Sequence, residues 1–388
     1  HALEVIRAHP VTAGASAFGG IVLIVLCTLL VVHKTVDTNV AFTTINTQNG
    51  TVSAYNAENQ VLFSLPYTIV ASHSGSRLFA DRLQKQIVVA RAAGSTDNIL
   101  ITSLTLGKEL TSSPYARVKF LDGLGHEIKS FPPPDGHIAF RGRPYVVPLG
   151  AMQISVVETP PAGATEFFAV YSGARSPTPI QRNTVKGSAV GVFWHFGNLR
   201  TDTVDLNDDG HPELLLYGQN DVDDYKRVAL PIIDIVDPSS IVGSTESSAS
   251  RGFGLTENRG EQFYLSFPIP DAARLASVGM TVHDVAHLPD GKLIAFVAGN
   301  DGTTDDETQV GYDAIFEKSM RVLLIKPNNG LIGLHKKFFE QGKIASPLTD
   351  SYLTDLVSQV RYWNGSDWVS TPVRITQTAS PSPIPSSH

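Results

Sequence analysis

The sequence predicts an all-β body with a β-propeller-like arrangement of about six or seven blades, placed behind one N-terminal transmembrane helix. Short apolar runs separated by turn residues continue from about residue 35 almost to the C-terminus. Residues 11–32 contain no charged side chain. After them, no pattern predicts an amphipathic helix longer than a few turns, and the short helices expected are Ser76–Gln86 and Tyr352–Val360. The alternative fold is a pair of β-sandwiches, because their hairpins leave the same pattern in a sequence.

The composition is typical of a folded, turn-rich protein and excludes several functions. The chain has 388 residues, of which 42% are hydrophobic and 17% charged, with 32 Gly and 24 Pro. A net charge of −7 argues against nucleic-acid binding, which needs clustered Lys and Arg. Cys27 is the single cysteine, so an intrachain disulfide, a thiolate zinc site and a C-x-x-C-H haem attachment are excluded.

The N-terminal apolar stretch predicts an uncleaved membrane anchor. It is long enough to cross roughly 30 Å of hydrocarbon as a helix, and no A-x-A cleavage site follows it. Arg7 on one flank is matched by Lys34 on the other, so charge does not settle the orientation. The predicted organisation is a flank (1–10), a transmembrane helix (11–34), a large β domain (35–375) and a Pro/Ser-rich extended tail (376–388).

Two segments predict contact with other membrane protein subunits. The first half of the apolar stretch has small residues four positions apart, which would let another helix approach closely. These pairs are Ala13 with Ala17, Ala15 with Gly19, and Ser16 with Gly20. The ordinary abundance of Ala and Gly in membrane helices explains them equally well. The tail has few core-forming residues and is expected to lie extended on a partner surface.

Within the body, an apolar run, a turn and a second apolar run recur. D-G or N-G turns, which suit tight hairpins, occur at Asp122-Gly123, Asp290-Gly291 and Asn329-Gly330. A related pattern without such a dipeptide covers 52–64. These segments are unevenly spaced, but they would suit blades of roughly 40 to 50 residues each.

The stretch from Asp205 to Tyr217 has the most specific pattern of the chain. Oxygen ligands for a hard cation fall at positions 1, 3, 5, 7 and 9 of a loop, namely Asp205, Asn207, Asp209, the His211 carbonyl and Glu213. Gly210 at position 6 permits a sharp turn. An EF-hand would need a bidentate Glu at position 12, where this chain has Leu216. The apolar run that follows predicts a buried strand instead of a helix.

These residues resemble the calcium loops of FG-GAP and VCBS-type repeats, in which D-x-[DN]-x-D-G-x-x-[DE] leads into a strand of a propeller blade. The resemblance is confined to the loop and the strand after it, and it implies a structural Ca²⁺ ion. The alternative is a polar hairpin that binds nothing. A site of this kind has weak to moderate affinity and suits a compartment rich in free calcium. We therefore expect the β domain to be extracytoplasmic, and periplasmic in a Gram-negative cell.

Other acidic and histidine-rich segments carry weaker signals. The acidic clusters at Asp221–Asp224 and Asp301–Glu307 fit solvated turns better than further ion sites. His283 and His287 have a zinc-like interval, but their surroundings read as a strand, so they are interpreted as structural. His195 is interpreted as a packed strand residue.

The sequence predicts a binding function without catalysis. It lacks a G-x-S-x-G elbow, a phosphate loop and a G-x-G-x-x-G motif. The leading hypothesis is a membrane-anchored extrinsic scaffolding subunit of a larger membrane complex, for example an energy-transducing assembly. One alternative is the extracytoplasmic sensor domain of a single-pass signalling protein whose cytoplasmic part precedes His1. The other is a polysaccharide hydrolase using a carboxylate pair.

The segment Tyr362–Trp368 also carries two interpretations. Its two tryptophans would suit carbohydrate stacking, but a hairpin stapled by a cross-strand aromatic pair is favoured.

Overall fold

The computed structural model describes residues 37–68, 86–91, 94–106, 117–146, 150–159, 163–172, 177–221, 229–299 and 309–375. The predicted transmembrane helix, its small-residue pairs and the C-terminal tail lie outside these ranges. In the ranges that are described, no helix is both long and apolar enough to cross a membrane.

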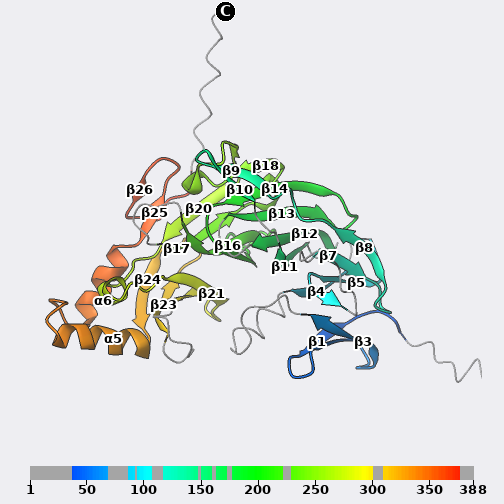
Figure 1. Cartoon of the computed structure of the whole chain (residues 1–388), viewed down its shortest axis with the longest axis horizontal. Coiled ribbons are helices and arrows are strands. Elements are labelled where there is room, and N and C mark those ends of the chain that lie inside the picture. Colours follow the sequence, from blue (N-terminus) through cyan, green and yellow to red (C-terminus); the bar gives the residue numbers. More distant parts are fainter. Residues whose placement is uncertain are drawn as a thin grey trace, which may run out of the picture.

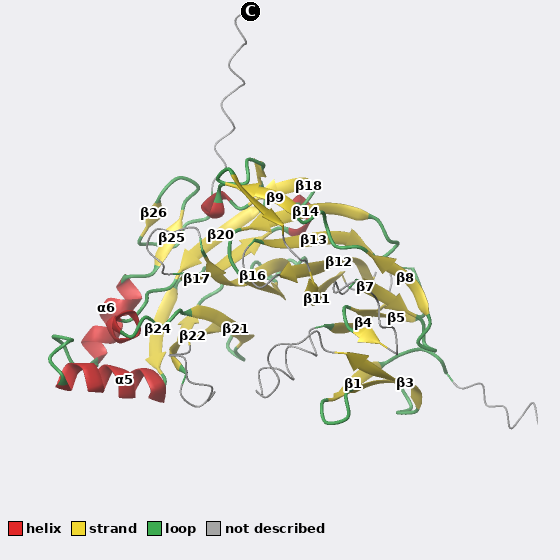
Figure 2. Cartoon of the chain, in the orientation of Figure 1, coloured by secondary structure: helices red, strands yellow, loops and turns green. Residues whose placement is uncertain are grey.

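The described chain is all-β and forms five sheets of at least four strands, together with a two-stranded ribbon (Figures 1 and 2). Sheet I contains β1 (Phe42–Asn46), β2 (Thr51–Tyr55), β3 (Val61–Thr68) and β6 (Thr105–Leu106). Sheet II contains β4 (Ile87–Arg91), β5 (Asn98–Thr102), β7 (Val118–Leu121) and β8 (Glu127–Phe131). The ribbon pairs β9 (His137–Phe140) with β10 (Arg143–Val146).

Two larger sheets and one smaller sheet follow. Sheet III contains β11 (Gly150–Thr159), β12 (Gly163–Ser172), β13 (Thr178–Thr184), β14 (Ala189–His195), β18 (Gly243–Glu246) and β19 (Thr256–Glu257). Sheet IV contains β15 (Leu199–Val204), β16 (Glu213–Asn220), β17 (Leu230–Val236), β20 (Glu261–Ser266), β25 (Arg361–Trp363) and β26 (Trp368–Val369). Sheet V contains β21 (Thr281–His287), β22 (Leu293–Gly299), β23 (Val310–Phe316) and β24 (Val322–Pro327).

Among the described residues the helices are few and short. They are η1 (Pro238–Ser240), η2 (Ser248–Ser250), α4 (Asp271–Leu275), α5 (Asn329–Glu340) and α6 (Asp350–Ser358). Helices α5 and α6 lie at the opposite end of the molecule from sheet I (Figure 1).

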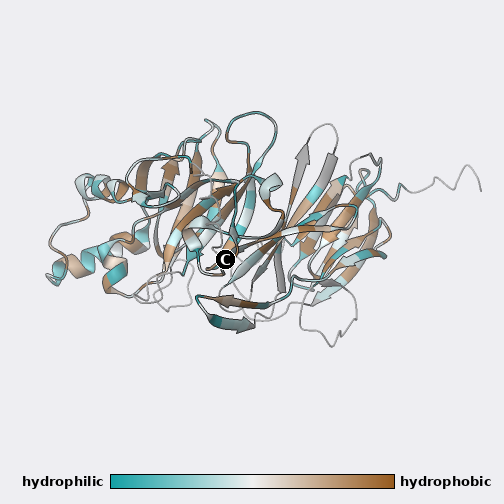
Figure 3. Ribbon diagram, turned by 90° about the horizontal axis from the view of Figure 1, so that it is seen from above, coloured by the Kyte–Doolittle hydropathy of each residue, from teal (hydrophilic) through white to brown (hydrophobic). Residues whose placement is uncertain are grey.

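Consecutive sheets pack against each other through separate hydrophobic clusters, which gives a propeller-like arrangement. Strand β16 shows the pattern: Leu214 and Leu216 pack toward sheet III, whereas Leu215 and Tyr217 pack toward sheet V. A strand buried on both faces reads as a continuous apolar run. Figure 3 shows such hydrophobic residues along the strands. This two-sided burial of inner sheets favours the propeller over a pair of sandwiches, but six or seven blades are not confirmed.

Most of the predicted turns are confirmed, and one is wrong. The Asp122 and Asp290 turns join β7 to β8 and β21 to β22. The segment after Asn328, expected to be a hairpin, begins helix α5 instead. The Asn328 side chain accepts a hydrogen bond from the N–H of Leu331 at 2.9 Å, which caps the helix. The helix predicted near Tyr352 is confirmed as α6.

Candidate functional sites

The Asp205 loop connects β15 to β16 and folds around its own side-chain oxygens. The Asp205 carboxylate accepts hydrogen bonds from the N–H groups of Asp209 (3.2 Å) and Gly210 (2.9 Å). Asn207 accepts a hydrogen bond from the same Asp209 N–H at 3.2 Å and donates to the Asp209 carboxylate at 2.8 Å. Asp208 and Gly210 have φ angles of 58° and 80°, which tighten the turn. The loop therefore brings Asp205, Asn207 and Asp209 together.

The two remaining predicted ligands, His211 and Glu213, lie at opposite ends of the second half of the loop. The N–H of His211 donates to Asp209 at 2.7 Å, and this hydrogen bond holds the pKa of the Asp209 carboxyl below its ordinary value. Glu213 is buried at the base of the loop. Its carboxylate accepts hydrogen bonds from the Leu206 N–H (3.0 Å) and the Gln262 side chain (3.3 Å).

The predicted oxygen donors for a cation lie at two levels of this loop, three side chains at its tip and Glu213 at its base. Among the described residues, no three His, Cys, Asp or Glu side chains gather in a way that could hold a metal. Asp205, Asn207 and Asp209 fit oxygen coordination, and the His211 carbonyl is available by its position in the loop. Both carboxylate oxygens of Glu213 are engaged in fixing the loop base.

A lysine from the neighbouring sheet also reaches this loop. Lys318, in the turn between β23 and β24, donates to the Asp205 carbonyl at 2.8 Å and forms an ion pair with Asp208. The ammonium group links the loop of sheet IV to sheet V and offsets part of its negative charge. No local sequence pattern indicates this contact, because Lys318 lies far along the chain.

The other predicted candidates have structural roles where they are described. His283 lies 3.1 Å from the Ala298 carbonyl through Nε2. His287 lies four positions after His283 on strand β21, about 13 Å away, which is too far for a shared zinc ion. Asp221 donates its N–H to the Phe196 carbonyl at 3.0 Å. The acidic residues 223, 224 and 301–307 lie outside the described residues.

The hairpin formed by β25 and β26 carries the predicted aromatic pair. The rings of Trp363 and Trp368 lie 5.5 Å apart, in a T-shaped arrangement. The indole N–H of Trp363 donates to the Ser248 hydroxyl at 3.1 Å, and Trp368 packs edge-on against Tyr264. The pair thus staples the hairpin and contacts residues buried beneath it.

Beneath that hairpin lies a set of buried side chains that we call the buried polar cluster. Its members, contributed by sheets III and IV and by the segment around η2, are His195, Asn220, Asp234, Ser247, Ser248, Glu261 and Tyr264. Strand register places Asp234 on β17 opposite Tyr264 on β20. His195 ends β14 and is fully buried, which confirms it as a packed strand residue.

Tyr264 connects two members of the buried polar cluster. Its hydroxyl accepts a hydrogen bond from the Asn220 side chain at 2.7 Å and lies 3.0 Å from His195 Nε2. Burial lowers the pKa of His195 to about 3, so the imidazole is neutral at physiological pH. The other ring nitrogen of His195, Nδ1, is buried without a hydrogen-bond partner among the described residues.

The cluster also contains two buried acids. Burial and then the charge of Glu261 raise the pKa of Asp234 well above its ordinary value. Burial likewise raises the pKa of Glu261, although the Ser248 N–H donates to its carboxylate at 2.8 Å. The two side chains hydrogen-bond each other, which requires a proton on one of them. Because both residues are almost fully buried, they are not placed to attack a polysaccharide chain.

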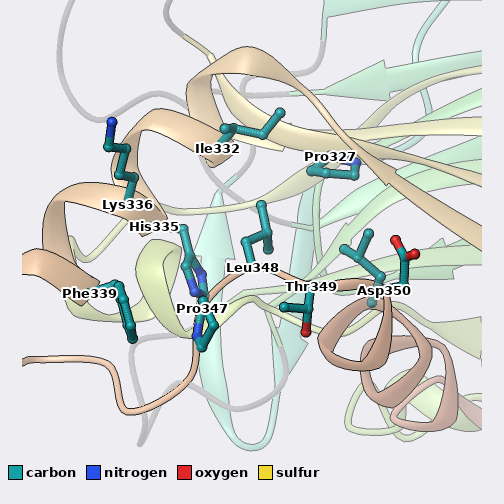
Figure 4. A pocket seen from close by; sticks show the side chains of 10 residues that line it. Pro327, Ile332, His335, Lys336, Phe339, Pro347, Leu348, Thr349 and Asp350 are labelled. Carbon is teal, nitrogen blue, oxygen red and sulfur yellow. The ribbon is translucent and has the colours of Figure 1, made fainter.

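A separate pocket of about 340 Å³ lies between helices α5 and α6 (Figure 4). Its lining is mainly apolar: Pro327, Ile332, Phe339, Pro347, Leu348 and Leu353, with the polar residues His335, Lys336, Thr349 and Asp350. His335 is held by the Ser346 carbonyl, 2.9 Å from its Nε2. Ile332 and Phe339 remain 43% and 40% exposed, so the pocket opens onto an apolar surface.

A smaller pocket of about 270 Å³ is lined by residues of β4, β11 and β15. The amide of Gln153 on β11 hydrogen-bonds the backbone N–H and carbonyl of Thr201 on β15. This contact joins sheets III and IV. The pocket therefore lies at the junction of two sheets, and its polar lining is used to hold them together.

Comparisons with known proteins do not assign a family. No family model matches the chain, and no curated protein matches it. The resemblance of the Asp205 loop to FG-GAP and VCBS-type repeats therefore has no support from a family model. A crystal structure of a protein of unknown function from Bacteroides caccae aligns with 76% of this chain and 94% of its own, at 9% identity and a TM-score of 0.26. A likeness this weak carries no argument about function.

Proposed function

We propose that the chain is a membrane-anchored extrinsic scaffolding subunit that binds a partner membrane protein through the pocket between α5 and α6. The observation that carries the proposal is the apolar pocket with exposed walls. A predicted anchor before residue 35 would hold this surface beside other membrane subunits. The proposed ion in the Asp205 loop has a structural role.

The lining of the pocket suits a protein partner. Ile332 and Phe339 expose large apolar side chains, and Lys336 and Asp350 add charges of opposite sign. Specific protein interfaces combine an apolar centre with a polar rim in this way. Leu323 and Leu324, on the strand that leads into α5, are exposed as well. This end of the molecule thus offers apolar area beyond the pocket itself.

The proposed occupant is an apolar segment of a partner subunit that inserts one or two side chains. The volume of the pocket is at the low end for small-molecule sites, which enclose most of a ligand. Here much of the apolar area lies at exposed positions on the rim. A small ligand inside the pocket would leave that area in contact with solvent. A protein segment would cover both the pocket and its rim.

Substituting Ile332 by glutamate tests this proposal. A carboxylate at this position would lose its water when an apolar partner segment docks, so we expect the share of chain recovered in a stoichiometric complex from mild detergent to fall at least about tenfold. Val242→Glu, at an exposed apolar position outside the pocket, is the matched control and should leave recovery unchanged. Equal recovery of the complex with both variants, at equal melting temperature, would refute the pocket as the docking site.

The calcium proposal for the Asp205 loop has its own test. Asp209→Asn keeps an oxygen that can accept the hydrogen bond of His211 but removes a ligand charge. If calcium binds, 1 mM CaCl₂ should raise the melting temperature of the parent by about 5 °C more than that of the variant. In chelator the two proteins should melt together. The loop ion is rejected if both respond equally to calcium.

A further inference from the structure

The dipeptide Asn-Gly occurs at three positions of the chain, and the structure places each in a different setting. Asn49-Gly50 lies in the turn between β1 and β2, Asn364-Gly365 in the turn between β25 and β26, and Asn329-Gly330 at the start of α5. The side-chain amide of an asparagine can be attacked by the next backbone nitrogen, and glycine leaves that approach unhindered because it has no Cβ. The sequence makes the three pairs equivalent, whereas their hydrogen bonds distinguish them.

The Asn49-Gly50 pair leaves both reacting nitrogen atoms free. Asn49 is exposed. Among the described residues, its Nδ2 and the N–H of Gly50 donate no hydrogen bond. The Asn49 Oδ1 accepts a hydrogen bond from the Thr51 hydroxyl at 2.6 Å. The nitrogen that would attack and the nitrogen that would leave are thus unengaged, and the amide oxygen already has a donor.

Asn329 lies in backbone that is fixed as a helix. It follows the cap residue Asn328, whose carbonyl accepts the N–H of Ile332 at 3.0 Å. Closure of the Asn329 side chain onto the Gly330 nitrogen would need non-helical dihedral angles and would break this first turn. This pair is therefore protected by its helix.

Asn364 is held at its amide oxygen. Its Oδ1 accepts hydrogen bonds from the Ser366 N–H (2.9 Å), the Ser366 hydroxyl (3.0 Å) and the Asp367 N–H (2.8 Å). Arg251 also donates to the Gly365 carbonyl at 2.9 Å. The side chain therefore has to give up several hydrogen bonds before it can rotate toward the Gly365 nitrogen.

We propose that Asn49 is a site of spontaneous deamidation, with Gly50 as the nucleophile and Thr51 as the donor to the reacting carbonyl. The Gly50 nitrogen gives its proton to hydroxide and bonds to Asn49 Cγ. The charge that develops on Oδ1 is stabilised by the Thr51 hydroxyl, as in an oxyanion hole. The bond from Cγ to Nδ2 then breaks, and Nδ2 takes a proton from water and leaves as ammonia. Water opens the resulting succinimide to aspartate or isoaspartate.

The product changes the turn between β1 and β2. Either product adds one negative charge, and isoaspartate also inserts a methylene group into the main chain. The Gly50 carbonyl accepts the N–H of Tyr67 on β3 at 2.8 Å, so a longer turn would disturb this contact within sheet I. The proposal does not depend on the partner pocket or on the Asp205 loop, so each can fail separately.

Ageing the full-length chain in mild detergent at pH 8 tests the site. Peptide mass spectrometry follows conversion at each Asn-Gly pair, and enzymatic methylation of isoaspartate identifies the isomer. We expect Asn49 to convert at least about tenfold faster than Asn329 and at least about threefold faster than Asn364. Asn46 is the matched control, because it lies at the end of β1 beside the same turn without a following glycine, and it should stay intact.

Variants of Thr51 test the hydroxyl. Thr51→Val keeps the branched shape but removes the donor, so the conversion of Asn49 should slow at least about twofold. Thr51→Ser retains a hydroxyl and should keep at least about half of the difference. Equal melting temperatures would show that the turn is intact in both variants. The proposal is overturned if Asn49 converts no faster than Asn329, or if Thr51→Val converts as fast as the parent.

Discussion

Replacing Phe193 by alanine is expected to lower the free energy of unfolding by about 3–5 kcal/mol, because it leaves a cavity in a close-packed core. Phe193 lies on β14, is fully buried, and packs in the cluster that joins sheets III and IV with Leu216 and Ile232. Strand β14 is paired on both sides, with β13 and β18, and β16 is paired with β15 and β17. The backbone therefore has little freedom to collapse into the cavity. Urea denaturation followed by tryptophan fluorescence would measure the change.

Phe42→Ala provides the control for this prediction. Phe42 stacks on Tyr55 at 4.9 Å but is 39% exposed, so its loss should cost about 1 kcal/mol. If sheets III and IV unfold as one unit, Phe193→Ala should shift the midpoint without changing the slope of the transition. Equal losses from the two substitutions would contradict the packing described for this interface.

The strands of the body could be predicted from sequence because their burial leaves a local pattern. The run Leu214-Leu215-Leu216-Tyr217 is apolar at every position, since its alternate side chains enter two different clusters. The prediction of a turn at Asn329-Gly330 was wrong because Asn is common both in tight turns and at the N-caps of helices. The correct signal was the helical spacing of Leu331, Leu334 and Phe338, which pack on one core.

The candidate sites were less accessible to sequence reasoning. The turn at Asp205 is encoded locally, by the spacing of its Asx side chains and Gly210. Its contacts with Lys318 and Gln262 come from a distant turn and a distant strand, and no local pattern records them. The buried polar cluster is also assembled from several elements. One signal was present: Asp234 is a lone acid within the apolar strand Leu230–Val236.

Asp234→Asn is expected to raise the free energy of unfolding by about 1–3 kcal/mol at pH 8, because the native pair must hold a proton that the unfolded chain releases, and a neutral amide at position 234 avoids that cost. The sign follows from proton linkage. The ordinary pKa values of the two acids are 3.8 and 4.5, and both are raised in the fold. Above those ordinary values the unfolded chain has lost a proton that the native pair retains, so native stability falls as pH rises.

The difference between variant and parent should therefore grow from pH 5 toward pH 9. Taking the difference cancels the contribution of His195, whose lowered pKa acts with the opposite sign below its ordinary value of 6.5. Tyr264 lies next to the pair, but its raised pKa keeps it neutral over this range. A variant less stable than the parent at pH 8 would show instead that the hydrogen bond between the two acids stabilises the fold by more than the retained proton costs.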